Sequence, residues 1–218
     1  MVQGAFDGVG PWADRARLKR ARGLDQVCLS DINEHWTGEV ELHLCAVKDC
    51  WSNKIVRYSI DTRLRSELAA AALGSAIPLH APAGTIVHSD RDSQSRSKKI
   101  LRLLKSNHLR GSMGRVASSR DNAAMESFLS LPQKNVLNTR RWNTREELRL
   151  AMVVWIEKKY NRRRRQRALR KFTPVEFETI CSAARPRNHP PPQCPANAAQ
   201  ARLPSSCVRT SRQANMLA

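Results

Sequence analysis

The sequence predicts an α/β domain built around one sheet, because strand-like and helix-like periods are mixed along the chain. Residues 40–48 and 55–60 alternate apolar and polar side chains around a turn at 51–53, which is typical of a β-hairpin with one better-buried face. Short strand-like runs follow at 85–89 and 110–113, with helical periods between and after them. An apolar fraction of 41% is enough to fill a core. Strands that come first and then mix with helices favour the α/β class.

The first half of the predicted domain has a weakly marked strand before the hairpin and a helix after it. Residues 26–30 read as the short strand. Asp61 or Thr62 is expected to cap the helix, because a side-chain oxygen there accepts from the first free backbone N–H groups. We expect the helix to close at Gly74 and Pro78, since both residue types disfavour a helix interior.

The second half is predicted to hold three further helices. Residues 97–107 are amphipathic, with apolar residues on one stripe. Asp121 or Asn122 is placed to cap a second helix, which contains Glu126, and Thr144 to begin the last. The last helix has an apolar stripe formed by Leu148, Met152, Trp155 and Ile156.

The net charge of +19 predicts a polyanionic partner, and nucleic acid is the commonest one inside a cell. The charge is concentrated in residues 140–171, which contain 13 Lys and Arg against 3 Asp and Glu. After residue 180 the chain has six of its eleven prolines and no acidic or aromatic residue. We therefore expect a poorly ordered arm at 1–26, a folded core at 27–180 and a disordered basic tail at 181–218.

Several classes of protein are disfavoured by the sequence. The longest apolar run, residues 68–79, has 12 residues, whereas a membrane helix needs about 20. No secretory signal is visible at the start, so we expect a cytoplasmic protein with no membrane partner, associated with the nucleoid when it is bound to DNA. The six cysteines show no C-x-x-C spacing, and we interpret them as buried or incidental thiols.

Three acidic residues could hold magnesium against a phosphate. Asp31 ends the first predicted strand, Asp90 ends the strand 85–89, and Glu126 lies in a helix after a gap of 35 residues. Mg²⁺ prefers carboxylate oxygens, and two-metal phosphoryl transfer needs such ligands from separate elements. In a chain with 19 acidic residues this spacing alone is also compatible with turn, cap or surface roles. Asp49 and Asp61 also end predicted strands and are rivals of Asp31.

Four blocks of sequence, in order and at the right spacing, resemble the integrase-core transposases. Residues 88–94 (HSDRDSQ) resemble their H-S-D-R-G-S-Q motif, and residues 114–128 resemble the block with their catalytic glutamate. Residues 30–34 (SDINE) resemble their T-D-I-T-E, and residues 160–174 resemble their closing motif. The resemblance covers residues 27–180 and is to the OrfB-type transposases of two-frame bacterial insertion sequences, the IS-three group.

This resemblance implies a ribonuclease H-like fold, similar to retroviral integrases, with a mixed five-stranded sheet flanked by helices. It implies a catalytic and metal-binding triad of Asp31, Asp90 and Glu126 that holds two Mg²⁺ or Mn²⁺ ions. The ions would activate water or a DNA 3′-hydroxyl for attack on a phosphodiester. His88 is two residues before Asp90 and is placed to hold the metal-binding carboxylates in position. Asn122 is placed to do the same beside Glu126.

DNA is the partner that the resemblance implies, both as element ends and as target. We expect a homo-oligomer, and the first-frame protein of the element or an intact transposase as further partners. Lys134 lies about two helical turns beyond Glu126, where it could touch a DNA end. The other predicted contacts form a basic strip beside Tyr160 that suits phosphates. The strip consists of Arg162, Arg163, Arg164, Arg165, Arg167, Arg170 and Lys171, and Lys158 and Lys159 just before it are further predicted contacts.

The sequence departs from the family pattern at several positions. Asp92 stands where the motif has glycine, and Gln166 and Arg170 stand where the closing motif has His and Gly. Pro132 is expected to end the Glu126 helix or to cost about 3 kcal/mol. Only 26 residues precede the first strand, too few for a helix-turn-helix region. We therefore expect a truncated transposase core, either active or an inactive remnant, with a non-catalytic DNA-binding protein, a regulator of an intact transposase and a cellular nuclease as alternatives.

Overall fold

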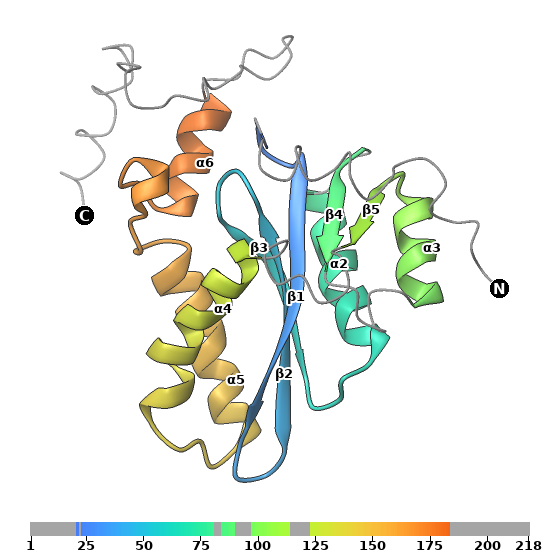
Figure 1. The fold of residues 1–218 in the computed structure, drawn as a ribbon. Helices are drawn as coiled ribbons and strands as arrows, with labels where there is room; N and C mark the ends of the chain where they lie inside the picture. The colour runs from blue at the N-terminus through green and yellow to red at the C-terminus, as the bar shows by residue number, and fades with distance from the viewer. Residues whose placement is uncertain (1–20, 22, 81–83, 90–96, 114–122, 184–218) are drawn as a thin grey trace.

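A computed structural model describes residues 21, 23–80, 84–89, 97–113 and 123–183. At its centre is a five-stranded sheet with the strand order β3-β2-β1-β4-β5 (Figure 1). The β1–β2 and β2–β3 pairs are antiparallel, and the β1–β4 and β4–β5 pairs are parallel, so the sheet is mixed as predicted. The strands are β1 (Val27–Trp36), β2 (Glu41–Asp49), β3 (Ile55–Asp61), β4 (Ile86–Ser89) and β5 (Arg110–Met113).

Helices cover both faces of the sheet. One face packs against α2 (Ser66–His80) and α3 (Lys98–Ser106). The other packs against α4 (Ala123–Asn135) and α5 (Arg145–Val154), which continues as a π-helix over Trp155–Tyr160. The last helix, α6 (Pro174–Ala183), lies near the β2–β3 turn (Figure 1). Within the part of the chain that the structure describes, no helix is long and apolar enough to cross a bilayer.

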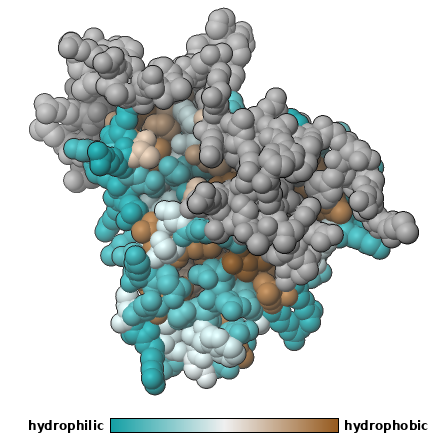
Figure 2. Space-filling view, in the orientation of Figure 1, coloured by the Kyte–Doolittle hydropathy of each residue, from teal (hydrophilic) through white to brown (hydrophobic). Residues whose placement is uncertain are grey.

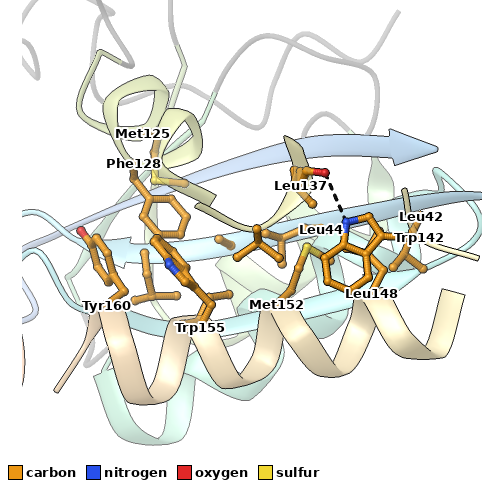
Figure 3. Close-up of a cluster of buried hydrophobic side chains, with 14 of the residues drawn as sticks. Leu42, Leu44, Met125, Phe128, Leu137, Trp142, Leu148, Met152, Trp155 and Tyr160 are labelled. Atoms are coloured by element: carbon orange, nitrogen blue, oxygen red, sulfur yellow. Dashed lines mark hydrogen bonds between the residues drawn. The ribbon is translucent and has the colours of Figure 1, made fainter. Parts of the chain in front are cut away.

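Two apolar clusters, one on each face, form the core. Because both faces are covered, β2 is buried on both sides, and the prediction of a single better-buried face was wrong. The first cluster includes Cys28, Val47, Leu68, Leu73 and Ile100. The second, drawn in Figure 3, includes Leu29, Leu44, Met125, Phe128, Met152, Trp155 and Tyr160. Trp155, on the predicted apolar stripe, is a core residue, and so is Trp142.

The first strand is longer than the sequence indicated. The prediction ended it at residue 30, whereas β1 runs for ten residues to Trp36. The second half of β1 has few buried residues of its own and is held by antiparallel pairing with β2, up to Trp36 opposite Glu41. Asp31 therefore lies inside β1 and does not end it.

Two helices run through residues that were expected to end them. α2 begins at Ser66 and passes both Gly74 and Pro78, because the buried face that includes Leu73 packs on the sheet along its length. α4 passes Pro132 and ends at Asn135, so of the two outcomes expected for Pro132, ending the helix was wrong. Val136 donates to the Pro132 carbonyl oxygen at 2.8 Å and is itself buried, so tertiary packing holds the last turn.

The start of the last predicted helix is confirmed. Thr144 is the N-cap of α5, and its hydroxyl accepts from the backbone N–H of Glu147 at 3.2 Å. Ser97 caps α3 in the same way, accepting from Ile100. The helix expected to begin at Asp61 or Thr62 begins instead at Ser66, a few residues later.

Candidate active site

Asp31 lies in β1 where the parallel part of the sheet ends. The described β1–β4 pairing ends at Ser30 opposite Ser89, and Asp31 is the next residue of β1. Its carboxylate accepts from the backbone N–H of Ile32 at 2.8 Å and is partly exposed. On β2 it faces Ala46, which is fully buried. Since side chains alternate along a strand, Asp31 shares the face of Leu29, the face that α4 covers.

Two predicted site residues lie outside the described residues. Asp90 follows Ser89 directly, and Asn122 precedes the first residue of α4. Asp92 is also outside. The roles of Asp90 and Asn122 therefore stay predictions.

Glu126 is exposed and lies in the first turn of α4. The residue before it, Met125, is fully buried, and Phe128 is 1% exposed. Both belong to the cluster that contains Leu29 of β1 (Figure 3). The elements that hold Asp31 and Glu126 are thus packed together on one face of the sheet.

A buried lysine, Lys48, joins this face of the sheet to α4 and was not singled out in the sequence. Lys48 pairs with Leu29 across the β1–β2 ladder and is 5% exposed. Its Nζ donates to the backbone carbonyl oxygen of Ala124 at 2.9 Å, two residues before Glu126. Burial lowers the pKa of Lys48 to about 8. In the sequence it reads as the polar end of an alternating strand, so only its burial distinguishes it.

His88 and Ser112 are in the same row of the sheet as Lys48. The register places Leu29 opposite His88, and His88 opposite Ser112. His88 is buried, and its Nδ1 lies 3.0 Å from the Ser112 hydroxyl oxygen. His88 therefore lies two residues along the sheet from the level of Asp31. This position agrees both with a role in supporting the carboxylates and with that of a polar residue packed beneath the site.

The two rival aspartates have other roles. Asp49 is fully buried, and its carboxylate accepts from the backbone N–H groups of Asp25, Trp51 and Ser52. Burial raises the pKa of Asp49, and these hydrogen bonds oppose the rise. Asp61 is exposed at the end of the edge strand β3. Neither residue is on β1 beside the end of β4.

The predicted DNA-binding side chains are all exposed, and they lie on three parts of the chain. Lys134 is in the last turn of α4, about 12 Å along the axis from Glu126. Lys158 and Lys159 are in the π-helix. The loop after it contains the exposed residues Arg162, Arg163, Arg164, Arg165 and Arg167.

We call residues 162–172, which follow the π-helix, the arginine loop. Two buried residues, Asn161 and Tyr160, anchor it to the rest of the fold. The amide of Asn161 accepts from the backbone N–H of Ile55 at 3.1 Å and donates to its carbonyl oxygen at 3.0 Å. The Tyr160 hydroxyl donates to the Asn53 carbonyl oxygen, and its ring lies 4.9 Å from that of Phe128. Tyr160 is therefore a core residue that joins the loop to the first turns of α4 (Figure 3). Arg165 is partly neutralised by Glu176, 4.0 Å away.

Figure 2 shows the same face as Figure 1 coloured by hydropathy. Most of the visible described surface is hydrophilic, with apolar residues in a few patches. Exposed large apolar residues include Trp36 in the β1–β2 hairpin and Leu150 on α5. This surface favours a polar partner over a broad apolar one.

The arginine loop contains backbone strain at Arg170, a position where the family motif has glycine. Arg170 has φ 55° and ψ 36°, and Lys171 has φ 67°, both in the left-handed region. Residues other than glycine rarely adopt this left-handed conformation, because their Cβ atom comes too close to the following carbonyl oxygen. The loop is closed by the Gln166–Phe172 bridge.

Replacing Arg170 by glycine is expected to stabilise the fold by up to about 1 kcal/mol, because it relieves this strain at the expense of some chain entropy. Urea unfolding monitored by circular dichroism measures the change. Arg167→Gly, in the short 3₁₀-helix of the same loop, is the matched control and should destabilise. Equal loss of stability in both variants would contradict the strain argument.

The donors at this site suit a hard divalent cation. Asp31 and Glu126 offer carboxylate oxygens, which Mg²⁺ and Mn²⁺ prefer, and Asp31 faces small Ala46. Among the described residues no group of three His, Cys, Asp or Glu side chains is close enough to hold a metal ion. Of the cysteines described, Cys28 and Cys45 are buried, and Cys50 and Cys181 are partly buried.

Comparisons with known proteins agree on one family. Two family profiles, both described as Integrase core domain, match residues 23–119 and 107–174. The Insertion element IS600 uncharacterized 31 kDa protein of Shigella sonnei is 36% identical over 154 residues, covering 70% of this chain and 57% of that protein. Transposase InsF for insertion sequence IS3A of Escherichia coli (strain K12) is 34% identical over 159 residues, covering 72% and 55%. The chain thus spans just over half the length of these relatives.

A solved structure shows the same fold. A chain of the simian T-cell lymphotropic virus intasome, solved in complex with the PP2A regulatory subunit B56 gamma, superposes with a TM-score of 0.59 at 17% identity. The superposition covers 80% of this chain and 60% of that one. The fold is therefore ribonuclease H-like and similar to retroviral integrases, as predicted.

Proposed function

Since the chain belongs to the integrase core family, which its profiles match over residues 23–174, we propose that it is the catalytic core of a DNA transposase. In this role it cleaves a phosphodiester at an element end and transfers the strand to target DNA. The observation that carries the proposal is the position of Asp31. It is partly exposed beside the end of the β1–β4 pairing, on the face where α4 brings Glu126.

The proposed ligands of two divalent ions are Asp31, Asp90 and Glu126. Integrase-core proteins generally use such ions, which activate the attacking oxygen and stabilise the leaving one. The protein itself holds the carboxylates in position. β1 fixes Asp31 by pairing with β2 at this residue and with β4 up to Ser30, and Met125 and Phe128 hold the first turn of α4 against the sheet. On this proposal His88 and Asn122 support the carboxylates, and His88 is itself oriented by Ser112.

DNA is the proposed substrate, and the arginine loop supplies most of its binding. Arg162, Arg163 and Arg164 are exposed beside Tyr160, which contacts Phe128 two residues beyond Glu126. A duplex on this loop would therefore pass close to the first turn of α4. Contacts of arginine to phosphate position DNA without reading its sequence. We further propose a homo-oligomer that binds paired element ends on the bacterial nucleoid, with the first-frame protein or an intact transposase as partners.

The test of the proposed function is nicking of supercoiled plasmid in Mg²⁺ or Mn²⁺, compared with EDTA. The wild-type protein should nick only with metal, and Glu126→Gln should not nick. Glu67→Gln is the matched control, because Glu67 is also an exposed glutamate in the first turn of a helix, on the opposite face of the sheet. Equal nicking by wild type and Glu126→Gln would refute the proposal, since the activity would then belong to a contaminating nuclease.

A non-catalytic DNA-binding protein is the second candidate. The arginine loop favours it, because Asn161 and Tyr160 fix the loop without any contribution from the carboxylates. A folded protein that binds duplex DNA but does not nick in either metal would support this candidate. Joining of a labelled 3′ end to plasmid would instead separate a transposase from a cellular nuclease, which only hydrolyses.

A further inference from the structure

Helix α3 has a basic face that the proposed active site does not use. Four of its nine residues are basic and none is acidic. Ile100 and Leu104 are buried against the sheet. The four basic side chains are all exposed, and they are Lys98, Lys99, Arg102 and Lys105.

Three of these cations form a stripe along the helix. Lys98, Arg102 and Lys105 follow each other at i, i+4 and i+7, so they share one face opposite the buried residues. The stripe spans about 10 Å, which corresponds to about three base-pair steps along duplex DNA. Lys99, beside the stripe, lies 3.8 Å from Glu67 of α2, and both side chains are more than half exposed.

The helix itself favours only one cation of the stripe, Lys105 in its last turn. The first turn of α3 contains Lys98 and Lys99 and has no acidic residue. Backbone N–H groups make the start of a helix positive, so cations there raise the free energy of the folded protein. A polyanion bound to this face would reverse that effect, because it would pair with the cations that the helix repels.

This face is far from the arginine loop. α3 packs on the face of the sheet opposite α4 and α5, at the end where β5 is the edge strand. Figure 1 shows α3 at the right of the molecule and α5 and α6 at the left, with the sheet between them. The arginine loop follows the π-helix that continues α5, so the two basic surfaces lie on opposite sides of the sheet.

We propose that the basic face of α3 is a second duplex-binding surface, which contacts phosphates of a DNA segment different from the one on the arginine loop. The proposal rests on the proposed function, because strand transfer requires an element end and a target to be held together. The exposed side chains of this face are lysine and arginine, which suit sequence-independent contact with the phosphate backbone. One protein molecule can then hold two duplexes, one on each side of its sheet.

The test is a bridging experiment in EDTA with the full chain. One duplex is immobilised, and capture of a second, labelled duplex is measured together with binding of a single duplex. The α3 variant is Lys98→Gln, Arg102→Gln and Lys105→Gln combined, and the loop variant is Arg162→Gln, Arg163→Gln and Arg164→Gln combined. Circular dichroism checks that both are folded.

The α3 variant should bind the first duplex within about threefold of wild type and capture the second at least about tenfold less well. The loop variant should retain binding of a duplex to the α3 surface, and adding the α3 substitutions to it should abolish that binding. In each variant the slope of log affinity against log salt should change by about 0.9 for each lost phosphate contact. Bridging by the α3 variant at the wild-type level would overturn the proposal, since an oligomer would then bridge through the arginine loops alone. Equal loss of single-duplex binding and bridging would also overturn it.

Cleavage is not part of this experiment, so the two proposals fail separately. The bridging assay can be repeated with Glu126→Gln protein and should give the same result. Loss of nicking with α3-dependent bridging intact would remove only the proposed catalysis. Metal-dependent nicking with bridging unaffected by the α3 substitutions would remove only the second surface.

Discussion

Asparagine in place of Asp31 is expected to lower metal-dependent DNA cleavage about a thousandfold or more while leaving the stability of the fold unchanged. A carboxylate that holds a catalytic metal contributes several kcal/mol to the transition state, and the amide that replaces it has no charge. Asp31 is partly exposed, and its carboxylate accepts from the N–H of the next residue, a hydrogen bond that an asparagine oxygen can also accept. Initial nicking rates and urea midpoints of the two proteins measure both quantities.

Asp49→Asn is the matched control, because the same change of charge is made in a residue with a structural role. Asp49 is fully buried and accepts from three backbone N–H groups and the Ser52 hydroxyl. Its substitution should cost about 2 kcal/mol of stability, since a buried acceptor loses partners. Cleavage per folded molecule should be unchanged. The opposite pattern, with cleavage lost at position 49 and kept at position 31, would assign the first metal ligand to the β2–β3 turn.

Those elements of the fold that depend on local pattern were predicted well. The hairpin of β2 and β3 was expected at 40–48 and 55–60 and lies at Glu41–Asp49 and Ile55–Asp61. The strand β5 was predicted at residues 110–113, where the structure has it. In these segments turn residues and alternation are set by the segment itself.

The remaining elements depend on contacts between distant segments, which a single sequence does not display. The second half of β1 has a polar pattern and becomes a strand because β2 pairs with it. α4 continues past Pro132 because Val136, beyond it, is buried. In both cases tertiary contacts outweigh a local preference, and a reading by propensity alone ends the element too early.

The candidate site shows the same division. Asp31 and Glu126 could be named from the wording of the motifs around them, since neither has a distinctive local pattern. Lys48 has no motif, and its importance is visible only in its burial and in its hydrogen bond to Ala124 of α4. The anchoring of the arginine loop by Asn161 joins residues 106 positions apart and was equally hidden.

Lys48→Met is expected to remove a pH-dependent destabilisation of about 3 kcal/mol, which the buried ammonium of Lys48 causes below about pH 8. Burial lowers the pKa of Lys48 from 10.5 in an ordinary lysine to about 8 in the folded protein. Between these pH values the unfolded chain keeps the proton that the folded protein has released, so the free energy of unfolding rises with pH. Below pH 8 the buried ammonium costs the fold about 3 kcal/mol, since each pKa unit corresponds to about 1.4 kcal/mol.

Other groups that titrate in this range act in the opposite direction. Burial raises the pKa values of Cys50, Tyr58 and Tyr160 to about 12, so their unfolded forms lose protons first and stability falls above about pH 9. Both proteins contain these groups, and the effects of Tyr58 and Tyr160 cancel in the difference between wild type and Lys48→Met, whereas the effect of Cys50, whose pKa the Lys48 charge lowers, cancels only in part. That difference, from urea unfolding at several pH values, should rise in favour of wild type from pH 7 to pH 10.5.

The sign of the difference at neutral pH tests whether Lys48 is retained at a cost. If the ammonium destabilises the fold, Lys48→Met is the more stable protein at pH 7, although it loses the hydrogen bond to the Ala124 carbonyl oxygen. Methionine fits because it is unbranched and similar in length. A charge kept at such a cost, two residues along the sheet from Asp31 and hydrogen-bonded to the first turn of the Glu126 helix, is suited to a position beneath carboxylates. A difference that stays flat across pH 7–10.5 would show instead that Lys48 titrates as an ordinary exposed lysine.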